Sequence, residues 1–167
     1  MQPDENIEII FLMKIKSLLL LILPLMLVLD SCKKIDAEEQ ANIDDSTIQK
    51  FISEKNIVAQ KHSSGIYYQI LSTGSGNISY SSNTTVSTKY TGRLLSGTVF
   101  DGTTTQPISF KLGQVISGWQ IGIPLIQKGG KIRLLIPSAL AYGPDGQGPI
   151  PGNAVLDFDI ELLDVTN

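Results

Sequence analysis

The sequence predicts an α+β domain in which several β-strands surround one short α-helix, over about Lys61–Asn167. Several segments of this range alternate apolar and polar residues or are rich in β-branched residues, which is typical of strands. One segment between them has the character of a short helix, and no internal repeat is present. Roughly 100 residues are enough to enclose one hydrophobic core. We therefore expect one domain, preceded by an N-terminal signal segment and a short helical extension.

The strands are expected in five places: Ile66–Leu71, Val86–Leu95, Ile108–Leu112, Ile132–Ile136 and Val155–Val165. Ser72–Thr85 is dense in Ser, Thr, Gly and Asn, which predicts a turn followed by a polar strand edge. Leu95–Thr98 is a turn marked by glycine. The helix is expected within Trp119–Gln127, where Pro124 keeps it short because proline disrupts a helix interior.

The amino terminus has the pattern of a bacterial secretory leader. Lys14 and Lys16 precede the apolar run Leu18–Leu29, which is shorter than the ~20 residues that a membrane-crossing helix needs. Leu29-Asp30-Ser31-Cys32 resembles a lipobox, in which the cysteine is lipidated and becomes the first mature residue. We expect residues 1–31 to be a leader and lipoprotein signal peptide, starting at Met1 or Met13. The alternative is a signal anchor followed by an ordinary cysteine.

Residues 32–60 are predicted to form a tether that contains a short amphipathic helix. Lys33–Ala41 is charged and polar, and Asp44-Asp45-Ser46-Thr47 offers N-cap residues. Ile48, Phe51 and Ile52 follow at the i, i+3, i+4 spacing of one helix face, which predicts a helix over residues 46–55. Its apolar stripe is expected to dock on the domain, with a second subunit as the alternative.

The composition excludes much enzymology. One cysteine excludes a disulfide framework, an iron–sulfur cluster and a cysteine-rich zinc site. One histidine excludes a histidine-based metal cage and leaves little scope for a Ser-His-Asp triad. The formal charge of −3, with no basic block, argues against a nucleic-acid partner. We therefore expect no metal and no cofactor.

Two polar motifs have simple structural interpretations. Lys128-Gly129-Gly130-Lys131 lacks the spacing of a phosphate-binding loop and precedes a strand where such a loop must open a helix, so it predicts a turn. Asp157, Asp159 and Glu161 alternate along one strand and therefore share a face, which we expect to be solvated. Cation binding is the alternative, but the loop geometry of a calcium site is missing.

Aromatic and aliphatic residues gather beside the turns: Tyr90, Phe100, Phe110, Val115, Ile116, Trp119, Tyr142 and Phe158. They could simply form the core. However, Asp101 directly follows Phe100, and a carboxylate beside apolar groups needs a hydrogen-bonding partner. Tyr142 begins a loop rich in glycine and proline that runs to Gly152. An apolar concavity with a few polar groups is the usual form of a ligand pocket.

A series of motifs follows in order along the chain. They are Tyr90-Thr91-Gly92, Gly97-Thr98-Val99-Phe100-Asp101, the run Phe110–Trp119 (FKLGQVISGW), the run Ile136–Gly143 (IPSALAYG), Ile150-Pro151 and the run Val155–Leu163. Over Gly65–Leu163 the chain thereby resembles the FKBP-type peptidyl-prolyl cis-trans isomerases, especially the secreted bacterial members. It departs from their pattern at Thr103-Thr104-Thr105, where an arginine is often found, and at Ile108, where an aromatic residue is usual. In the loop after Tyr142, Gln147 and Pro149 also replace common family choices.

The resemblance implies a bent antiparallel sheet wrapped around the short helix, with a proline-binding pocket between them. In that pocket Trp119 would be the floor, Asp101 and Tyr142 the polar groups, and the Ile116 N–H a donor to the substrate carbonyl. These four residues form the implied catalytic set. The implied substrate-binding set is Tyr90, Phe100, Phe110, Val115, Ile150 and Phe158.

The predicted function is isomerisation of X-Pro bonds by an isomerase domain at residues 61–167, assisting the folding of exported proteins. Its partners would be proline-containing polypeptides, macrolide ligands of immunophilins, and a membrane reached through lipidated Cys32. The protein would lie in the bacterial cell envelope, facing the periplasm or the cell surface. One alternative is a non-catalytic, lipid-anchored chaperone or peptide-binding module that uses the same pocket. Another is a structural envelope protein with a vestigial pocket.

Overall fold

The computed structural model describes residues 36–103 and 105–167. Within this range, Asp36–Asn167 forms one compact unit. The predictions made for residues 1–31 and for Cys32 lie outside the described residues. No helix among the described residues is both long enough and apolar enough to cross a membrane.

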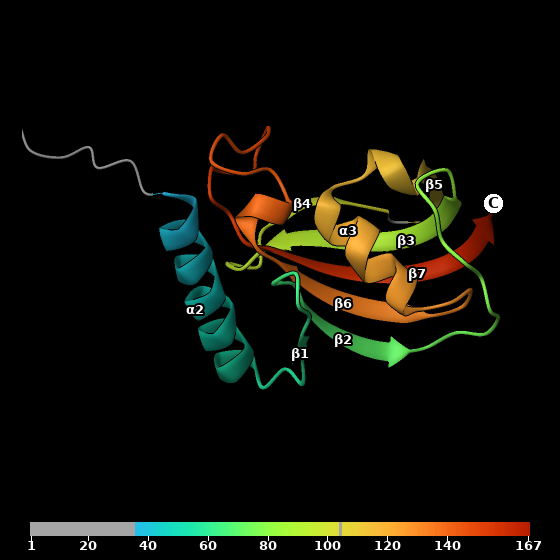
Figure 1. Cartoon of the computed structure of the whole chain (residues 1–167), viewed down its shortest axis with the longest axis horizontal. Helices are drawn as coiled ribbons and strands as arrows, with labels where there is room; N and C mark the ends of the chain where they lie inside the picture. Colours follow the sequence, from blue (N-terminus) through green and yellow to red (C-terminus); the bar gives the residue numbers. More distant parts are fainter. Residues whose placement is uncertain (1–35, 104) are drawn as a thin grey trace, which may run out of the picture. The chain divides into compact units, whose positions relative to one another are not determined.

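The unit is built on a seven-stranded antiparallel sheet (Figure 1). Its spatial order is β1-β2-β6-β7-β3-β4, and β5 also pairs with β3. The strands are β1 (Gln60–Lys61), β2 (Tyr67–Ser72), β3 (Thr85–Leu94), β4 (Val99–Gly102), β5 (Ile108–Lys111), β6 (Lys131–Ile136) and β7 (Leu156–Thr166). The predicted α+β class, with an antiparallel sheet and a short helix, is confirmed.

The five strands expected from the sequence are present, and β1 and β4 were missed. β1 has two residues and β4 has four, too few for an alternating pattern to be recognised. β4 matters for the site because it carries Phe100 and Asp101. Its pairing with β3 brings Asp101 opposite Gly92.

The short helix α3 (Ser117–Gly122) packs on one face of the sheet, in front of β6 and β7 in Figure 1. A methyl group on Gly118 would lie 2.5 Å from Ile136, and one on Gly122 would lie 2.5 Å from Leu134. The two glycines, one helical turn apart, therefore allow the close approach. The helix begins two residues before the predicted segment, and Pro124 lies in the 3-10 turn η3 (Ile123–Leu125) that follows it.

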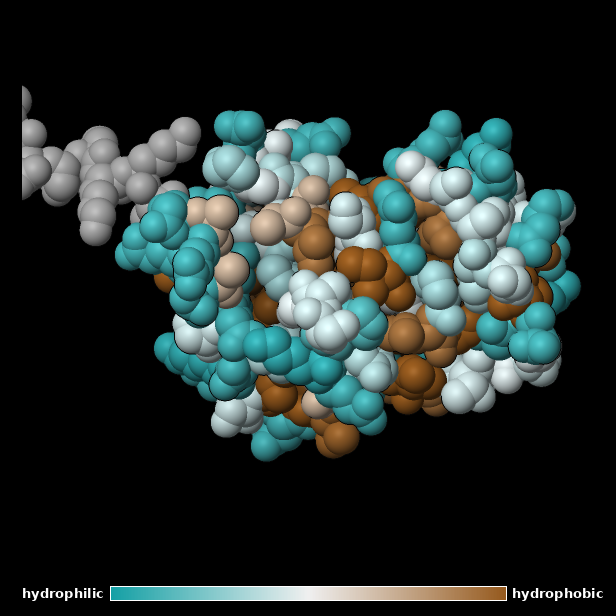
Figure 2. All heavy atoms as spheres, viewed as in Figure 1, coloured by the Kyte–Doolittle hydropathy of each residue, from teal (hydrophilic) through white to brown (hydrophobic). Residues whose placement is uncertain are grey.

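The main core lies between α3 and this face of the sheet. It is formed by residues that alternate along the long strands, among them Ile132, Leu134 and Ile136 of β6 and Leu156, Phe158, Ile160 and Leu162 of β7. Seen from the α3 side, hydrophobic residues show through the polar surface near the middle of the molecule (Figure 2).

The N-terminal helix is longer than the sequence analysis predicted. α2 spans Ala37–Lys55, so the expected start at residue 46 and the non-helical character of Lys33–Ala41 are wrong for residues 37–45. Asp36 is the N-cap and accepts a hydrogen bond from the Glu39 N–H at 2.8 Å. The candidate caps Asp44 and Asp45 lie inside the helix because their carboxylates bind other elements of the domain.

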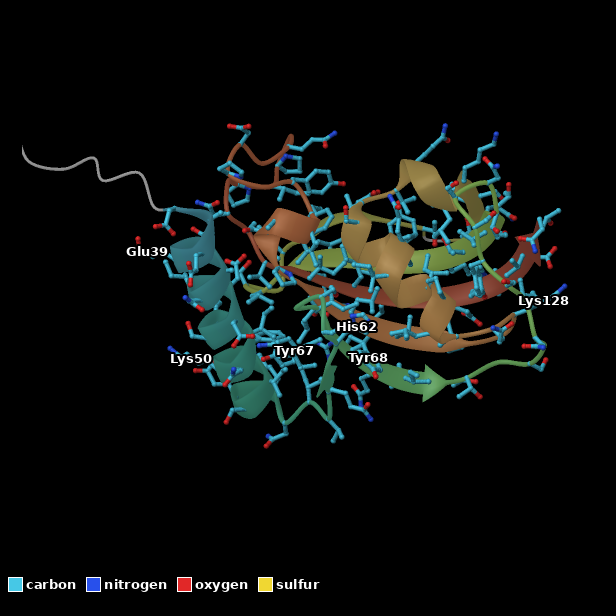
Figure 3. The ribbon with its side chains drawn as sticks, viewed as in Figure 1. Glu39, Lys50, His62, Tyr67, Tyr68 and Lys128 are labelled. Carbon is cyan, nitrogen blue, oxygen red and sulfur yellow. The ribbon has the colours of Figure 1, made fainter. Side chains whose placement is uncertain are left out.

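The apolar stripe of α2 docks on the domain, as expected. Ile48 is fully buried and forms a second, smaller core with Tyr67, Leu135 and Val155. In Figure 3, Tyr67 lies between α2 and the sheet, whereas Lys50 lies on the outer side of the helix. A left-handed Asn56 ends α2 and donates from its N–H to the carbonyls of the last turn.

The acidic face of β7 is not fully solvated, and the prediction is wrong for Asp157. Its side chain is buried and accepts hydrogen bonds from Arg133 at 2.9 and 2.8 Å and from Arg93 at 3.3 Å. The Arg133 guanidinium in turn lies 6.0 Å from the Phe51 ring of α2. The alternation correctly placed the acidic residues on one face, but it could not show that arginines and α2 cover part of that face.

Candidate functional site

A cavity of about 300 Å³ opens between α3, β4 and the centre of the sheet. It is lined by Tyr90, Phe100, Asp101, Phe110, Gln114, Val115, Ile116, Trp119, Tyr142, Gln147 and Phe158. The structure thus brings together all members of the predicted catalytic and substrate-binding sets except Ile150. Ile150 is instead buried in the main core.

The floor of the cavity is an aromatic cluster centred on Trp119, which is 4% exposed. The indole meets three rings nearly at right angles, with centroid distances of 5.0 Å to Tyr90, 5.4 Å to Phe158 and 5.9 Å to Phe110. Phe100 meets Phe158 in the same way at 5.6 Å. Edge-to-face contacts of this kind are favoured because the positive ring edge meets the negative ring face.

Trp119 also brings an unsatisfied polar group to the floor. Its Nε1–H is buried and has no hydrogen-bond partner among the described residues. A buried donor without a partner costs free energy, and such groups are uncommon in folded proteins. The aromatic floor therefore contains one buried donor without a partner among the described residues.

Gly92 allows the aromatic walls to pack directly on β3. A methyl group at this position would lie 2.6 Å from the Phe158 ring and 2.8 Å from the Phe100 ring. Any side chain here would push both rings out of place. This close approach is the physical reason for the glycine of the Tyr90-Thr91-Gly92 motif.

Asp101 is an exposed residue of β4 that lines the cavity, and its carboxylate accepts two hydrogen bonds. The Tyr90 hydroxyl donates to its Oδ2 at 2.7 Å, and the Gly102 N–H donates to its Oδ1 at 2.8 Å. Burial raises the pKa of the Tyr90 phenol far above its usual range, and the bond to the Asp101 carboxylate raises it further. Tyr90 therefore stays protonated and remains a donor.

Tyr142 reaches the cavity from the segment that follows the 3-10 turn η4 (Ser138–Leu140). Its side chain is half-buried. Burial raises the pKa of its phenol, and the negative charge of Asp101 adds to this rise. The phenol therefore stays neutral at physiological pH and can donate a hydrogen bond.

Ile116 stands at the N-terminus of α3. Its carbonyl accepts from the N–H groups of Trp119 and Gln120, whereas its own N–H makes no backbone hydrogen bond within the described residues. The Gln120 side chain donates to the Val115 carbonyl at 2.8 Å and holds this segment in place. The Ile116 N–H is thus available beside the cavity.

Gln114 and Gln147 also line the cavity, although neither was predicted to have a role in the site. Gln114 belongs to the 3-10 turn η2 (Leu112–Gln114), and Gln147 to the loop after Tyr142. Neither segment has a periodic pattern from which a side-chain direction could be read. For Gln114 the available signal was its position directly before Val115 in the FKLGQVISGW run.

Neither Thr103 nor Ile108, at which the sequence departs from the family pattern, lines the cavity. Thr103 ties β4 to β3: its N–H donates to the Tyr90 carbonyl at 2.9 Å, and its Oγ1 accepts from the Tyr90 N–H at 3.0 Å. Ile108 is exposed on β5 and does not line the cavity. Among the residues that the structure describes, no group of three or more His, Cys, Asp or Glu side chains is placed to hold a metal ion.

Comparison with known proteins agrees with this geometry. A family model described as FKBP-type peptidyl-prolyl cis-trans isomerase matches residues 76–163. The FKBP-type peptidyl-prolyl cis-trans isomerase FkpA of Escherichia coli K12 is 45% identical over 119 residues, which cover 70% of this chain and 43% of that protein. A probable FKBP-type isomerase of Haemophilus influenzae is 48% identical over 105 residues, 61% of this chain and 43% of the relative. The chain thus spans less than half the length of these curated relatives.

Two solved structures are also similar. The crystal structure of FkpA from Escherichia coli superimposes with a TM-score of 0.68 at 35% identity, covering 99% of this chain and 74% of that one. A peptidyl-prolyl cis-trans isomerase from Pseudomonas syringae pv. tomato superimposes with a TM-score of 0.64 at 34% identity, covering 76% of this chain and 96% of that one. Both proteins therefore share the fold of this chain and about a third of its sequence.

Proposed function

Because the chain belongs to the family of FKBP-type peptidyl-prolyl cis-trans isomerases, we propose that it accelerates the cis–trans isomerisation of X-Pro bonds in polypeptides. The observation that carries this proposal is the cavity of about 300 Å³, with its aromatic floor and its three polar groups at Asp101, Tyr142 and Ile116. The cavity suits a proline ring, which is apolar, flanked by peptide groups, which need hydrogen bonds.

The chemistry requires no covalent step. An X-Pro bond resists rotation by about 18–20 kcal/mol because amide resonance is lost when the bond twists. The twisted amide has less charge separation than the planar one, so an apolar cavity that excludes water favours the twisted state. Trp119, Tyr90, Phe100 and Phe158 supply that environment in our proposal, with Phe110 and Val115 completing the walls.

The polar groups then orient the peptide. The Ile116 N–H donates to a carbonyl of the substrate, and the Tyr142 hydroxyl donates to a second acceptor on it. Asp101 holds Tyr90 in position through the 2.7 Å hydrogen bond and places a negative charge at the cavity edge. Each tenfold gain in rate needs only about 1.4 kcal/mol, so several modest contacts are sufficient.

The test is the cis-to-trans rate of X-Pro tetrapeptides, with several X residues, in the presence of the full chain. We expect clear acceleration, reduced about threefold to tenfold by Tyr142→Phe, the range that loss of one hydrogen bond produces. Tyr68→Phe is the matched control, because it removes a hydroxyl that bonds to Gln60, outside the cavity. It should leave the rate unchanged.

The alternatives predict different results. No acceleration by a folded chain that still binds proline peptides would favour the non-catalytic peptide-binding module. No binding at all would favour the structural envelope protein. Macrolide ligands of immunophilins offer a further check, because a ligand of this cavity should compete with the tetrapeptide.

We also propose that the protein is an envelope lipoprotein that acts on exported polypeptides. The support is the pair Lys14 and Lys16 followed by the apolar run Leu18–Leu29, and the lipobox-like sequence that ends at Cys32. Mass spectrometry of the mature protein should find Cys32 at the N-terminus carrying acyl chains. Cys32→Ser should abolish the modification and release the protein from membranes. An unmodified cysteine within a longer mature chain would contradict the anchor.

A further inference from the structure

The structure contains a buried carboxylate for which the proposed mechanism has no use. Asp44 of α2 is 2% exposed, and no salt bridge compensates it among the described residues. A buried charge of this kind is costly unless hydrogen bonds satisfy it. Its Oδ2 accepts from the Ser138 N–H at 2.8 Å and the Ser138 hydroxyl at 2.6 Å, and its Oδ1 accepts from the Gln40 amide at 2.7 Å.

Ser138 is the first residue of η4, the turn that leads to Tyr142. An N–H at the start of a helical turn has no partner within the turn itself. Asp44 supplies that partner from a segment 94 residues away in the sequence. The bonds are charge-assisted, which makes them stronger than bonds between neutral groups. Figure 1 shows the N-terminal half of α2 beside this turn.

The same serine holds the other end of the turn. Its carbonyl accepts from the Ala141 N–H at 3.0 Å and from the Gly143 N–H at 2.9 Å. Tyr142 lies between these two donors. The backbone on both sides of Tyr142 is therefore tied to Ser138, and Ser138 is tied to Asp44.

We propose that Asp44 is a positioning residue for the isomerase site. Through its bonds to Ser138, α2 sets the turn that presents the Tyr142 hydroxyl to the cavity. This inference rests on the proposed function, in which Tyr142 orients the substrate. It also gives the N-terminal helix a role beyond linking the domain to whatever precedes it.

The neighbouring residue provides a control for general loss of helix docking. Asp45 also anchors α2, but it bonds to Tyr67 at 2.9 Å and to Lys61 at 2.5 Å, next to β1 and β2. Neither partner lines the cavity. If α2 merely stabilises the fold, loss of either carboxylate should have the same consequence. If Asp44 positions Tyr142, only its loss should affect the site.

The experiment compares Asp44→Ala, Asp44→Asn and Asp45→Ala in the full chain. We measure kcat and KM with X-Pro tetrapeptides, and the NMR signals of the Tyr142 ring with those of Tyr80 as an internal reference. Asp44→Ala should lower kcat about threefold to tenfold, as expected for a displaced hydrogen bond. Asp44→Asn should recover most of that loss, since its amide oxygen still accepts from Ser138. Asp45→Ala should leave kcat unchanged.

A second comparison tests whether Asp44 acts through Tyr142. In a Tyr142→Phe background, Asp44→Ala should cause no further loss of kcat, because the hydroxyl that it positions is already gone. The Tyr142 ring signals should move in Asp44→Ala and stay in place in Asp45→Ala, whereas the Tyr80 signals should stay in place in both.

The outcomes separate this inference from the proposed function. If the wild type does not accelerate isomerisation, the proposed function fails, and the ring signals alone decide the positioning role. If the wild type is active but Asp44→Ala keeps its kcat, or Asp45→Ala loses as much, the positioning role is overturned. If Asp44→Ala does not fold, Ser138→Ala takes its place, because it removes one of the two bonds. An unchanged kcat in Ser138→Ala would then overturn the inference.

Discussion

The two faces of the sheet differ in chemistry although the same strands build both. On β7, Phe158 and Ile160 point into the core beneath the cavity, whereas Asp157 and Asp159 point to the opposite face. On β6, Leu134 packs under α3, whereas Arg133 binds Asp157. Side chains alternate along a strand, so one sequence of residues serves both faces.

The polar groups on the two faces differ in whether they have partners within the protein. On the face opposite the cavity, the charges of Arg93, Arg133, Asp157 and Asp159 are paired with one another. On the cavity face, the Ile116 N–H and the Trp119 Nε1–H have no partner among the described residues. Paired groups contribute to stability, whereas the Ile116 N–H, beside the cavity, is available to a ligand. Substitutions on the first face should therefore change stability, and those on the second should change binding and rate.

Trp119→Ala should have the largest effect, because it should change both stability and ligand binding. Trp119 belongs both to the core and to the cavity floor, so we expect a loss of about 3–5 kcal/mol in stability together with loss of proline-peptide binding. Ile123→Ala is the matched control, because Ile123 is fully buried in the same core but does not line the cavity. It should lower the melting temperature while the folded protein keeps its affinity. Equal loss of affinity in both variants would show that the cavity depends only on overall core packing.

Asp157→Ala should destabilise the protein without disabling the site. The substitution leaves two half-buried arginines without their shared carboxylate, so we expect a loss of about 2–3 kcal/mol in the free energy of unfolding. Urea unfolding measures this loss. The kcat/KM of the remaining folded protein should stay within about twofold of the wild type, a difference of less than 0.5 kcal/mol. A tenfold fall in kcat/KM would show that the face opposite the cavity also affects catalysis.

Asp101→Ala should have a smaller effect on stability and a clear effect on turnover. It leaves the buried Tyr90 hydroxyl without its acceptor, which costs about 1–3 kcal/mol. Tyr90→Phe removes the other partner of the same bond, and the double variant completes a thermodynamic cycle. If the pair acts as a unit, the double variant should turn over no more slowly than Asp101→Ala. Full activity in Asp101→Ala would remove this residue from the proposed site.

The sequence predicted the strands that are long enough to alternate and the class of the fold. It failed where tertiary contacts decide the outcome. The start of α2 was misplaced because Asp44 and Asp45, good N-cap residues, bind other parts of the domain instead. Asp157 was placed on a solvated face because alternation shows which residues share a face, but not what covers that face.

For the candidate site, the residue types pointed to an apolar pocket, and the motifs resembling a known family supplied the individual roles. The hydrogen bond between Tyr90 and Asp101 could be expected only in part: the sequence predicted a partner for Asp101, but not which residue supplies it. Gln114 and Gln147 were missed because they lie in a 3-10 turn and a loop, where no periodicity indicates direction. The contact between Asp44 and Ser138 joins distant segments and has no signal in a single sequence.

The smallest effect that we expect concerns pH and the docking of α2 on the face opposite the cavity. The hydrogen bond from Lys61 lowers the pKa of Asp45 below its usual value of 3.8, and the Tyr67 hydroxyl lowers it further. A carboxyl group with a lowered pKa in the folded state stabilises the fold at pH values above its unfolded pKa. This stabilisation is lost as the pH falls through the folded pKa.

Asp45→Asn should therefore be slightly less stable than the wild type at pH 7, and the difference should shrink as the pH is lowered below about 4. Urea unfolding at several pH values measures it. Glu54→Gln is the control, because Glu54 and Lys50 are 3.9 Å apart and well exposed, and such a pair contributes almost nothing. The rate of isomerisation should not follow this titration, since Asp45 and its partners Lys61 and Tyr67 do not line the cavity. A rate that fell with protonation of Asp45 would mean that the contacts of α2 with β1 and β2 also affect the cavity. The two faces would then be coupled through the helix as a whole rather than through Asp44.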